Sequence, residues 1–147
     1  GGQMLDLAAE GRFGNDLAQA LDTGSIRQLQ AMKTGALISA SVMAGARIAG
    51  ATPSQGAALL ACGEALGAAF QIADDILDVE ASSATLGKAT AKDAAKGKAT
   101  LVQLMGLEAA RAERDRLAAH AISALDGFGA AAEMLRGAAH FAAHRSH

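Results

Sequence analysis

Three aspartates lie close together in one apolar stretch of the sequence, at positions 74, 75 and 78. On a helix Asp74 and Asp78 share one face, with Gln71 one turn before them, and Asp75 lies about 100° round. Carboxylates this close repel one another unless a cation neutralises them, and apolar surroundings raise the cost. Oxygen ligands in this number suit Mg²⁺, with water and substrate phosphates completing the coordination. The pattern predicts a magnesium site; the alternative is an acidic helix end exposed to water.

Lysines in two places could bind the anionic substrate of such a metal site. Lys33 is followed by Thr34 and Gly35 in an apolar segment. Its ammonium and the Thr34 hydroxyl could hold a phosphate oxygen where the glycine admits close approach. The same lysine could instead only extend its charged end to water. Lys88 and Lys98 each follow a glycine, which resembles a phosphate-binding loop weakly because the full P-loop pattern is absent.

The histidines and the cysteine indicate less chemistry. His140 and His144 are four residues apart, which could serve zinc, but no third ligand has suitable spacing. A frayed polar C-terminus is the favoured interpretation. Cys62, the single cysteine, lies among small residues and is interpreted as a packing residue. It cannot form an internal disulfide, which agrees with a reducing cytoplasm.

The composition of the 147-residue chain indicates that helices position these groups. Hydrophobic residues make up 51% and charged residues 19% of the chain, and Ala and Leu greatly outnumber Val and Ile. Because Ala and Leu lose little on entering a helix, the composition favours an all-α fold and excludes an all-β or doubly wound one. A net charge of −2 and 3% aromatic residues argue against nucleic-acid binding. Charged and polar residues interrupt the apolar stretches, so no membrane span is expected.

The expected helices follow from apolar spacing and start signals. Ser25, Thr52 and Thr100 each stand three residues before a glutamine, the spacing of a capping box. The lysine-rich segment 81–99 has little apolar surface to offset its ordering entropy, so we expect a mobile loop that closes over a polyanionic substrate when metal and substrate bind. The predicted helices span residues 4–9, 25–50, 53–79, a short segment from 101, 108–125 and 130–144. The second and third of them are expected to be two long inner helices.

Six motifs give a specific resemblance. They are Gly2–Leu7, Lys33–Leu37, Ala69–Asp78, Thr85–Lys88, Gly97–Thr100 and Gly106–Arg111. In these motifs and in their order the sequence resembles the trans-isoprenyl diphosphate synthase (polyprenyl synthetase) family, especially bacterial farnesyl diphosphate synthases. The resemblance covers almost the whole chain. Ala91, where relatives often have Gly, and Leu101, where many have Tyr or Phe, are mild departures.

The resemblance implies a fold, a reaction and roles for residues at matching positions. The fold is an all-α isoprenoid-synthase bundle with a central cavity. The reaction joins isopentenyl diphosphate to an allylic diphosphate, geranyl or dimethylallyl, with Mg²⁺ as cofactor. Asp74, Asp75 and Asp78 match the second aspartate-rich motif, with Asp74 as the main ligand of a third Mg²⁺, and Phe70 matches the aromatic residue beside the reacting carbons. The residues that match contacts to the allylic diphosphate are Lys33, Thr34, Gln71, Lys88 and Lys98, of which Lys33 and Lys88 act in catalysis with Asp74.

Members of the family are roughly twice as long, and their N-terminal half has no counterpart in this sequence. That half carries the first aspartate-rich motif with two Mg²⁺ sites and the basic residues that bind isopentenyl diphosphate. Residues 1–147 are therefore expected to be the C-terminal part of a single domain, inactive alone and completed by the missing half in a cytoplasmic homodimer. A non-catalytic regulatory or scaffold subunit is the alternative. A terpene cyclase fits the lysine motifs less well.

Overall fold

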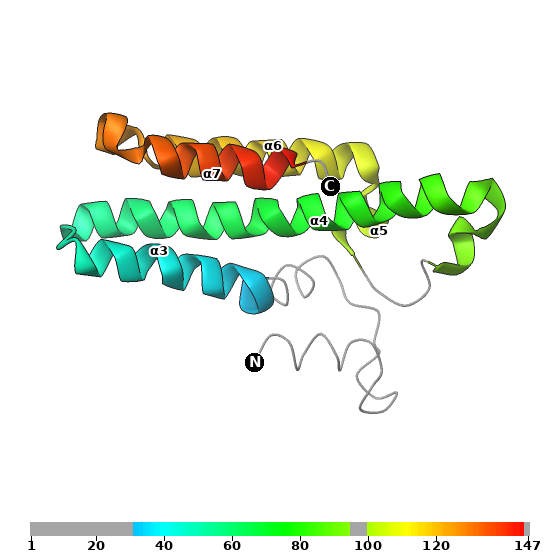
Figure 1. Ribbon diagram of the computed structural model, residues 1–147, viewed down its shortest axis with the longest axis horizontal. Helices are drawn as coiled ribbons and strands as arrows, with labels where there is room; N and C mark the ends of the chain where they lie inside the picture. The colour runs from blue at the N-terminus through cyan, green and yellow to red at the C-terminus, as the bar shows by residue number, and fades with distance from the viewer. Residues whose placement is uncertain (1–30, 95–99, 146–147) are drawn as a thin grey trace, which may run out of the picture.

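The protein is a bundle of helices in which one long helix runs through the middle. The computed structural model describes residues 31–94 and 100–145, and these contain no strand, which confirms the all-α expectation. Helix α4 lies between α3 on one side and the α6–α7 pair on the other (Figure 1). In chain order the elements are the π-helix η2 (Ala31–Gly35), α3 (Ala36–Ile48), α4 (Pro53–Ala94), α5 (Leu101–Met105), α6 (Leu107–Ser123), the 3₁₀-helix η4 (Asp126–Ala132) and α7 (Glu133–His144).

Two of the three predicted capping boxes are confirmed. At the start of α4 the Gln55 backbone N–H donates to Thr52 Oγ1 at 3.3 Å, and the Thr52 N–H donates to Gln55 Oε1 at 2.9 Å. Thr100 and Gln103 make the same reciprocal pair before α5. Each box satisfies N–H groups that a helix start leaves unpaired. The cap predicted at Ser25 and the helix predicted over 4–9 lie outside the described residues.

Helix α4 is much longer than the sequence pattern predicts. Its 42 residues run from Pro53 to Ala94, so the loop expected over 81–99 is wrong for residues 81–94; residues 95–99 lie outside the described part. The segment is poor in apolar residues, but it is rich in Ala and Lys and contains no proline. Extending an existing helix requires no new nucleation, and the five alanines between positions 81 and 94 favour this extension.

Glycines let α4 approach the preceding helices very closely. A Cβ at Gly67 would lie 2.7 Å from the Gly35 Cα, and one at Gly63 would lie 3.1 Å from the Ser39 Cα. Backbone is therefore packed against backbone where η2 meets α4. Gly35 was expected to let a phosphate oxygen come close because it has no side chain. In the structure the same feature lets α4 come close.

The chain reverses once more before α7. Gly129 has φ +56°, a conformation that only glycine adopts easily, and it interrupts the turn formed by η4. Arg136 stabilises this corner by donating to the carbonyl oxygens of Gly129 at 2.7 Å and Leu125 at 2.8 Å. Residues 140–144 are not frayed as expected, because α7 continues to His144 and the His144 Nε2 atom lies 3.1 Å from Asp115 Oδ1 on α6. Residues 146 and 147 lie outside the described part.

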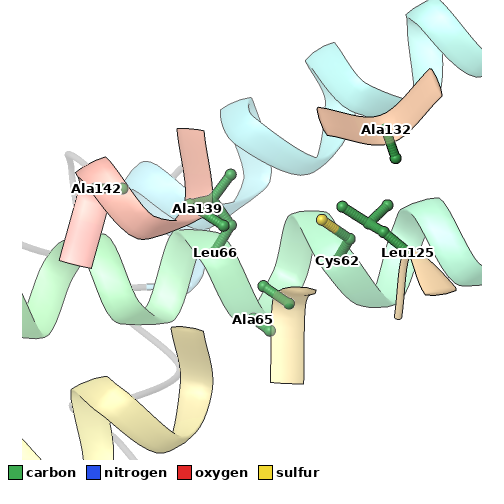
Figure 2. Close-up of a cluster of buried hydrophobic side chains, with 8 residues drawn as sticks. Cys62, Ala65, Leu66, Leu125, Ala132, Ala139 and Ala142 are labelled. Atoms are coloured by element: carbon green, nitrogen blue, oxygen red, sulfur yellow. The ribbon is translucent and has the colours of Figure 1, made fainter. Parts of the chain in front are cut away.

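The core forms where α4 meets α6 and α7. Cys62 and Leu125 are fully buried there beside small residues, so the packing role predicted for the cysteine is confirmed (Figure 2). Burial raises the pKa of the Cys62 thiol. Only α4 of the two predicted inner helices is enclosed by described helices on both sides. Helix α3 leaves Leu37 72% exposed and Ile48 89% exposed to solvent.

One described helix is long and apolar enough to cross a membrane by length and composition. It is the Pro53–Ala81 part of α4, with a mean hydropathy of 1.4 over its most apolar window, half of which is buried. No membrane span was expected from the sequence, and the apolar length of this stretch is greater than that expectation allowed. A core helix of a water-soluble fold passes the same test, and the finding is therefore weak evidence for a membrane.

Candidate diphosphate and metal site

A chain of hydrogen bonds ties η2 to the acidic part of α4. Thr34 Oγ1 donates to Gln71 Oε1 at 3.1 Å, and Gln71 Nε2 donates to Asp75 Oδ1 at 3.3 Å. Gln71 and Asp75 are only 6% and 2% exposed. Buried polar groups cost little stability when they are hydrogen-bonded, and these two hydrogen bonds pair the Gln71 and Asp75 side chains. The structure thus brings together three of the predicted site residues, which lie on two separate elements.

The π-helix turn sets the place of Lys33. It precedes Thr34 within η2, and both side chains are half-buried. Single π-turns are rare and are often found at functional sites, because the extra residue in the turn re-aims the neighbouring side chains. The Thr34 hydrogen bond holds this turn against α4 and fixes the position from which the lysine extends.

Asp74 and Phe70 are both in contact with Arg145, the residue that follows α7. Arg145 Nη2 donates to Asp74 Oδ1 at 2.8 Å, and the guanidinium carbon lies 4.0 Å from the centre of the Phe70 ring. The Asp74 side chain is 48% exposed and the Arg145 side chain 19%. Arg145 was not predicted as a site residue, because its partner lies 71 positions away and no local pattern marks it.

The three aspartates have different surroundings. Asp74 pairs with Arg145, Asp75 is buried against Gln71, and Asp78 is exposed. No group of three His, Cys, Asp or Glu side chains converges as a metal site within the described residues. Magnesium in phosphate-binding enzymes is held by one or two carboxylates together with substrate phosphates and water. The partly exposed Asp74 and the exposed Asp78, one turn apart, fit that requirement; the buried Asp75 fits it less well.

Lys88, one of the two remaining lysines of the predicted site, lies well beyond the aspartates on α4. Lys88 lies on α4 fourteen residues beyond Asp74, which is about 21 Å along a straight helix axis. A role for Lys88 beside Asp74 therefore requires α4 to bend or unwind, and it stays a prediction. Lys98 lies outside the described residues.

An ion pair fixes α6 to α4 just beyond the aspartates. Arg111 of α6 donates to Glu80 of α4 and to Glu108 one turn away on α6. The hydrogen bond to Glu80 is the largest cause of a raised Arg111 pKa, so the guanidinium stays charged. This contact holds the end of the acidic stretch in place.

Comparison with known proteins identifies the class to which this fold and site belong. The polyprenyl synthetase family model matches residues 1–132, and the chain belongs to that family. The expected family is therefore confirmed.

Individual relatives match parts of the chain. A protein of Sinorhizobium fredii named "Probable farnesyl diphosphate synthase" is 48% identical over 67 residues, 46% of this chain and 20% of its own length. A chloroplastic geranylfarnesyl diphosphate synthase of Leucosceptrum canum is 48% identical over 59 residues, 40% of this chain and 16% of its own length. The solved apo structure of an FPP/GFPP synthase from Zymomonas mobilis superposes with a TM-score of 0.78 and 36% identity, covering 96% of this chain and 44% of that one. The chain thus spans less than half the length of these relatives.

Proposed function

We propose that this chain supplies the allylic-diphosphate side of a Mg²⁺-dependent short-chain prenyl diphosphate synthase. The reaction condenses isopentenyl diphosphate with geranyl or dimethylallyl diphosphate. The names of the similar proteins, farnesyl and geranylfarnesyl diphosphate synthases, support this class of substrate. The proposal includes a homodimer, as expected from the family, and a location in the cytoplasm, as expected from the single cysteine.

One observation carries the proposal. The Thr34–Gln71–Asp75 hydrogen-bond chain holds a lysine-bearing turn against the helix face next to Asp74. A positively charged donor beside partly exposed carboxylates suits a polyanion that arrives with its own metal. An acidic surface helix would not need a buried polar chain to fix such a turn.

Each residue then has a defined task. Lys33 binds oxygens of the allylic diphosphate, and its positive charge stabilises the negative charge that grows on this leaving group. Thr34 can donate to a diphosphate oxygen only when its single hydroxyl proton turns away from Gln71 Oε1. Asp74 and Asp78 would hold Mg²⁺, which when bound supplies further charge stabilisation to the departing diphosphate. The Phe70 ring face attracts the allylic carbon as it becomes positive. The apolar helices around the site exclude water that would trap this cation.

The rest of the active site lies, in this proposal, outside the sequence described. The site for isopentenyl diphosphate and the first aspartate-rich motif have no counterpart among these residues. This chain alone is accordingly expected to be inactive.

The test is a product assay on the complete protein that carries this chain. With isopentenyl diphosphate and either dimethylallyl or geranyl diphosphate, we expect chain elongation that requires Mg²⁺ and stops when the metal is chelated. The isolated 147-residue chain serves as the comparison and should give no product. Absence of any elongation by the complete protein would refute the proposal.

A non-catalytic subunit of a prenyl synthase assembly is the second candidate. The same assay separates the two. A subunit without catalysis would change the activity of an added synthase partner but would show no dependence on its own Asp74 or Lys33.

A further inference from the structure

Arg145 makes two contacts that a single surface ion pair would not combine. Its guanidinium bonds to Asp74 Oδ1 at 2.8 Å and covers the Phe70 ring at 4.0 Å. The side chain is 19% exposed, although an unpaired arginine is usually solvated. Both partners come from one turn of α4, and the arginine comes from the other end of the chain.

The framework around Arg145 fixes this position. Helix α7 packs against α4 and α6 through Ala139, Ala142 and Ala143, all buried. His144 lies 3.1 Å from Asp115 of α6, and Arg145 then leaves the helix with φ −58° and ψ 132°. The guanidinium is therefore directed onto α4 by packed elements and not by a loose tail.

Both contacts are places where the proposed function requires a different cation. Asp74 would ligate a divalent metal, and the Phe70 ring face would lie against the allylic carbon as it becomes positive. A guanidinium satisfies both groups electrostatically, because it bonds carboxylates in a charge-assisted way and stacks on aromatic rings. A metal ion and a guanidinium repel each other and compete for the same carboxylate.

We propose that Arg145 is a positioning residue that holds Asp74 and Phe70 in place as a resident counter-cation and is displaced from Asp74 when a divalent cation binds. The inference rests on the proposed function for the role of Asp74. It adds that metal binding at this carboxylate is a cation exchange, so the arginine weakens metal affinity while keeping the two site residues oriented.

The test measures metal affinity in the complete protein that carries this chain. Free Mn²⁺ is titrated by electron paramagnetic resonance in the presence of inorganic pyrophosphate. Removing the competing cation in Arg145→Gln should tighten Mn²⁺ binding by about threefold to tenfold, the range expected for loss of a partly buried, charge-assisted ion pair. Arg145→Lys keeps a positive charge and should stay near the wild-type affinity.

A matched control and a double variant show where the effect acts. Arg116→Gln removes the same charge from an ion pair with Glu113 on α6, outside the site, and should leave the affinity unchanged. Asp74→Asn should weaken Mn²⁺ binding, and adding Arg145→Gln to it should have no further effect. The ¹⁵N signal of the Arg145 Nε–H group should shift on adding Mg²⁺ with pyrophosphate, independently of turnover.

The outcomes separate this inference from the function on which it rests. Unchanged or weaker Mn²⁺ binding in Arg145→Gln, while the wild-type protein elongates prenyl chains, overturns the inference alone. An equal effect of Arg145→Gln in the Asp74→Asn background also overturns it. If Asp74→Asn itself leaves Mn²⁺ affinity unchanged, the inference and the metal role in the proposed function both fail.

Discussion

Asp74 and Asp75 are neighbours in sequence but belong to two different environments on α4. Asp75 is 2% exposed and accepts a hydrogen bond from Gln71, which in turn is bonded to Thr34. Asp74 has a side chain that is 48% exposed and meets one arginine from the far end of the chain. One carboxylate is part of the packed frame, and the other is open to exchange of its partner.

The difference shows how one helix can serve two purposes. The face towards η2 is built from backbone in close contact, as at Gly67 and Gly35, and from buried hydrogen bonds. Such contacts are costly to change, because interiors are densely packed and unpaired buried groups are penalised. The face towards Arg145 can change its cation without disturbing that packing. Positioning and binding are therefore assigned to adjacent residues.

The largest effect that this comparison predicts is on catalysis at Asp74. Asp74→Ala in the complete protein should lower turnover by roughly a hundredfold or more, because it removes a metal ligand and not a packing group, and even outer-shell partners of metals contribute tenfold to hundredfold. The midpoint of urea unfolding should change little. Steady-state kinetics at saturating Mg²⁺ give the rate, and a nearly wild-type rate would mean that Asp74 is only a surface acid.

A substitution in the close contact between α4 and η2 should change the stability of the protein. Gly67→Ala should lower the free energy of unfolding by about 1–3 kcal/mol, because the new methyl group would meet the Gly35 backbone and force η2 away. Gly45→Ala is the matched control, since Gly45 also lies within a helix but has no atom within 4 Å of the added group. That change should stabilise by up to about 1 kcal/mol through helix propensity. Urea unfolding measures both, and equal effects would contradict the close approach.

A substitution of Lys33 tests whether the packing of η2 on α4 positions a residue that binds the substrate. Lys33→Ala should raise the KM for the allylic diphosphate by about tenfold, as expected for the loss of one charged hydrogen bond, and should leave the KM for isopentenyl diphosphate nearly unchanged. The measurement is the pair of KM values in the complete protein. If neither KM nor kcat moves, the lysine only extends its charged end to water.

Short-range features of this molecule could be predicted from the sequence, and long-range ones could not. The capping boxes at Thr52 and Thr100 involve residues three positions apart, and local chemistry decides them. The Thr34–Gln71 hydrogen bond spans 37 positions. The family resemblance named both residues, but only the packing of η2 on α4 brings them into contact.

Two errors have clear physical causes. The loop expected over 81–99 was inferred from the lack of apolar residues, although a helix that has already formed can continue without new nucleation, as α4 does to Ala94. Arg145 was overlooked because its contact with Asp74 depends on the length and direction of α7, which no pattern near position 145 encodes. The first error concerns propagation of a helix along the chain and the second concerns tertiary structure, and neither concerns residue chemistry.

The smallest predicted effect concerns the Thr34–Gln71 hydrogen bond, which belongs to the buried environment of Asp75. Thr34→Val keeps the shape of the side chain but removes the donor to Gln71 Oε1. Gln71 is 6% exposed, so its oxygen loses its partner with little access to water, and unfolding should become easier by about 1 kcal/mol. Because η2 is then held less firmly, the KM for the allylic diphosphate should rise by about twofold to fivefold, less than for Lys33→Ala. Thr34→Ser retains the hydroxyl and should restore most of both losses. If Thr34→Ser and Thr34→Val behave alike in urea unfolding and in KM, the hydroxyl does not hold the turn, and packing between the glycines alone must position Lys33.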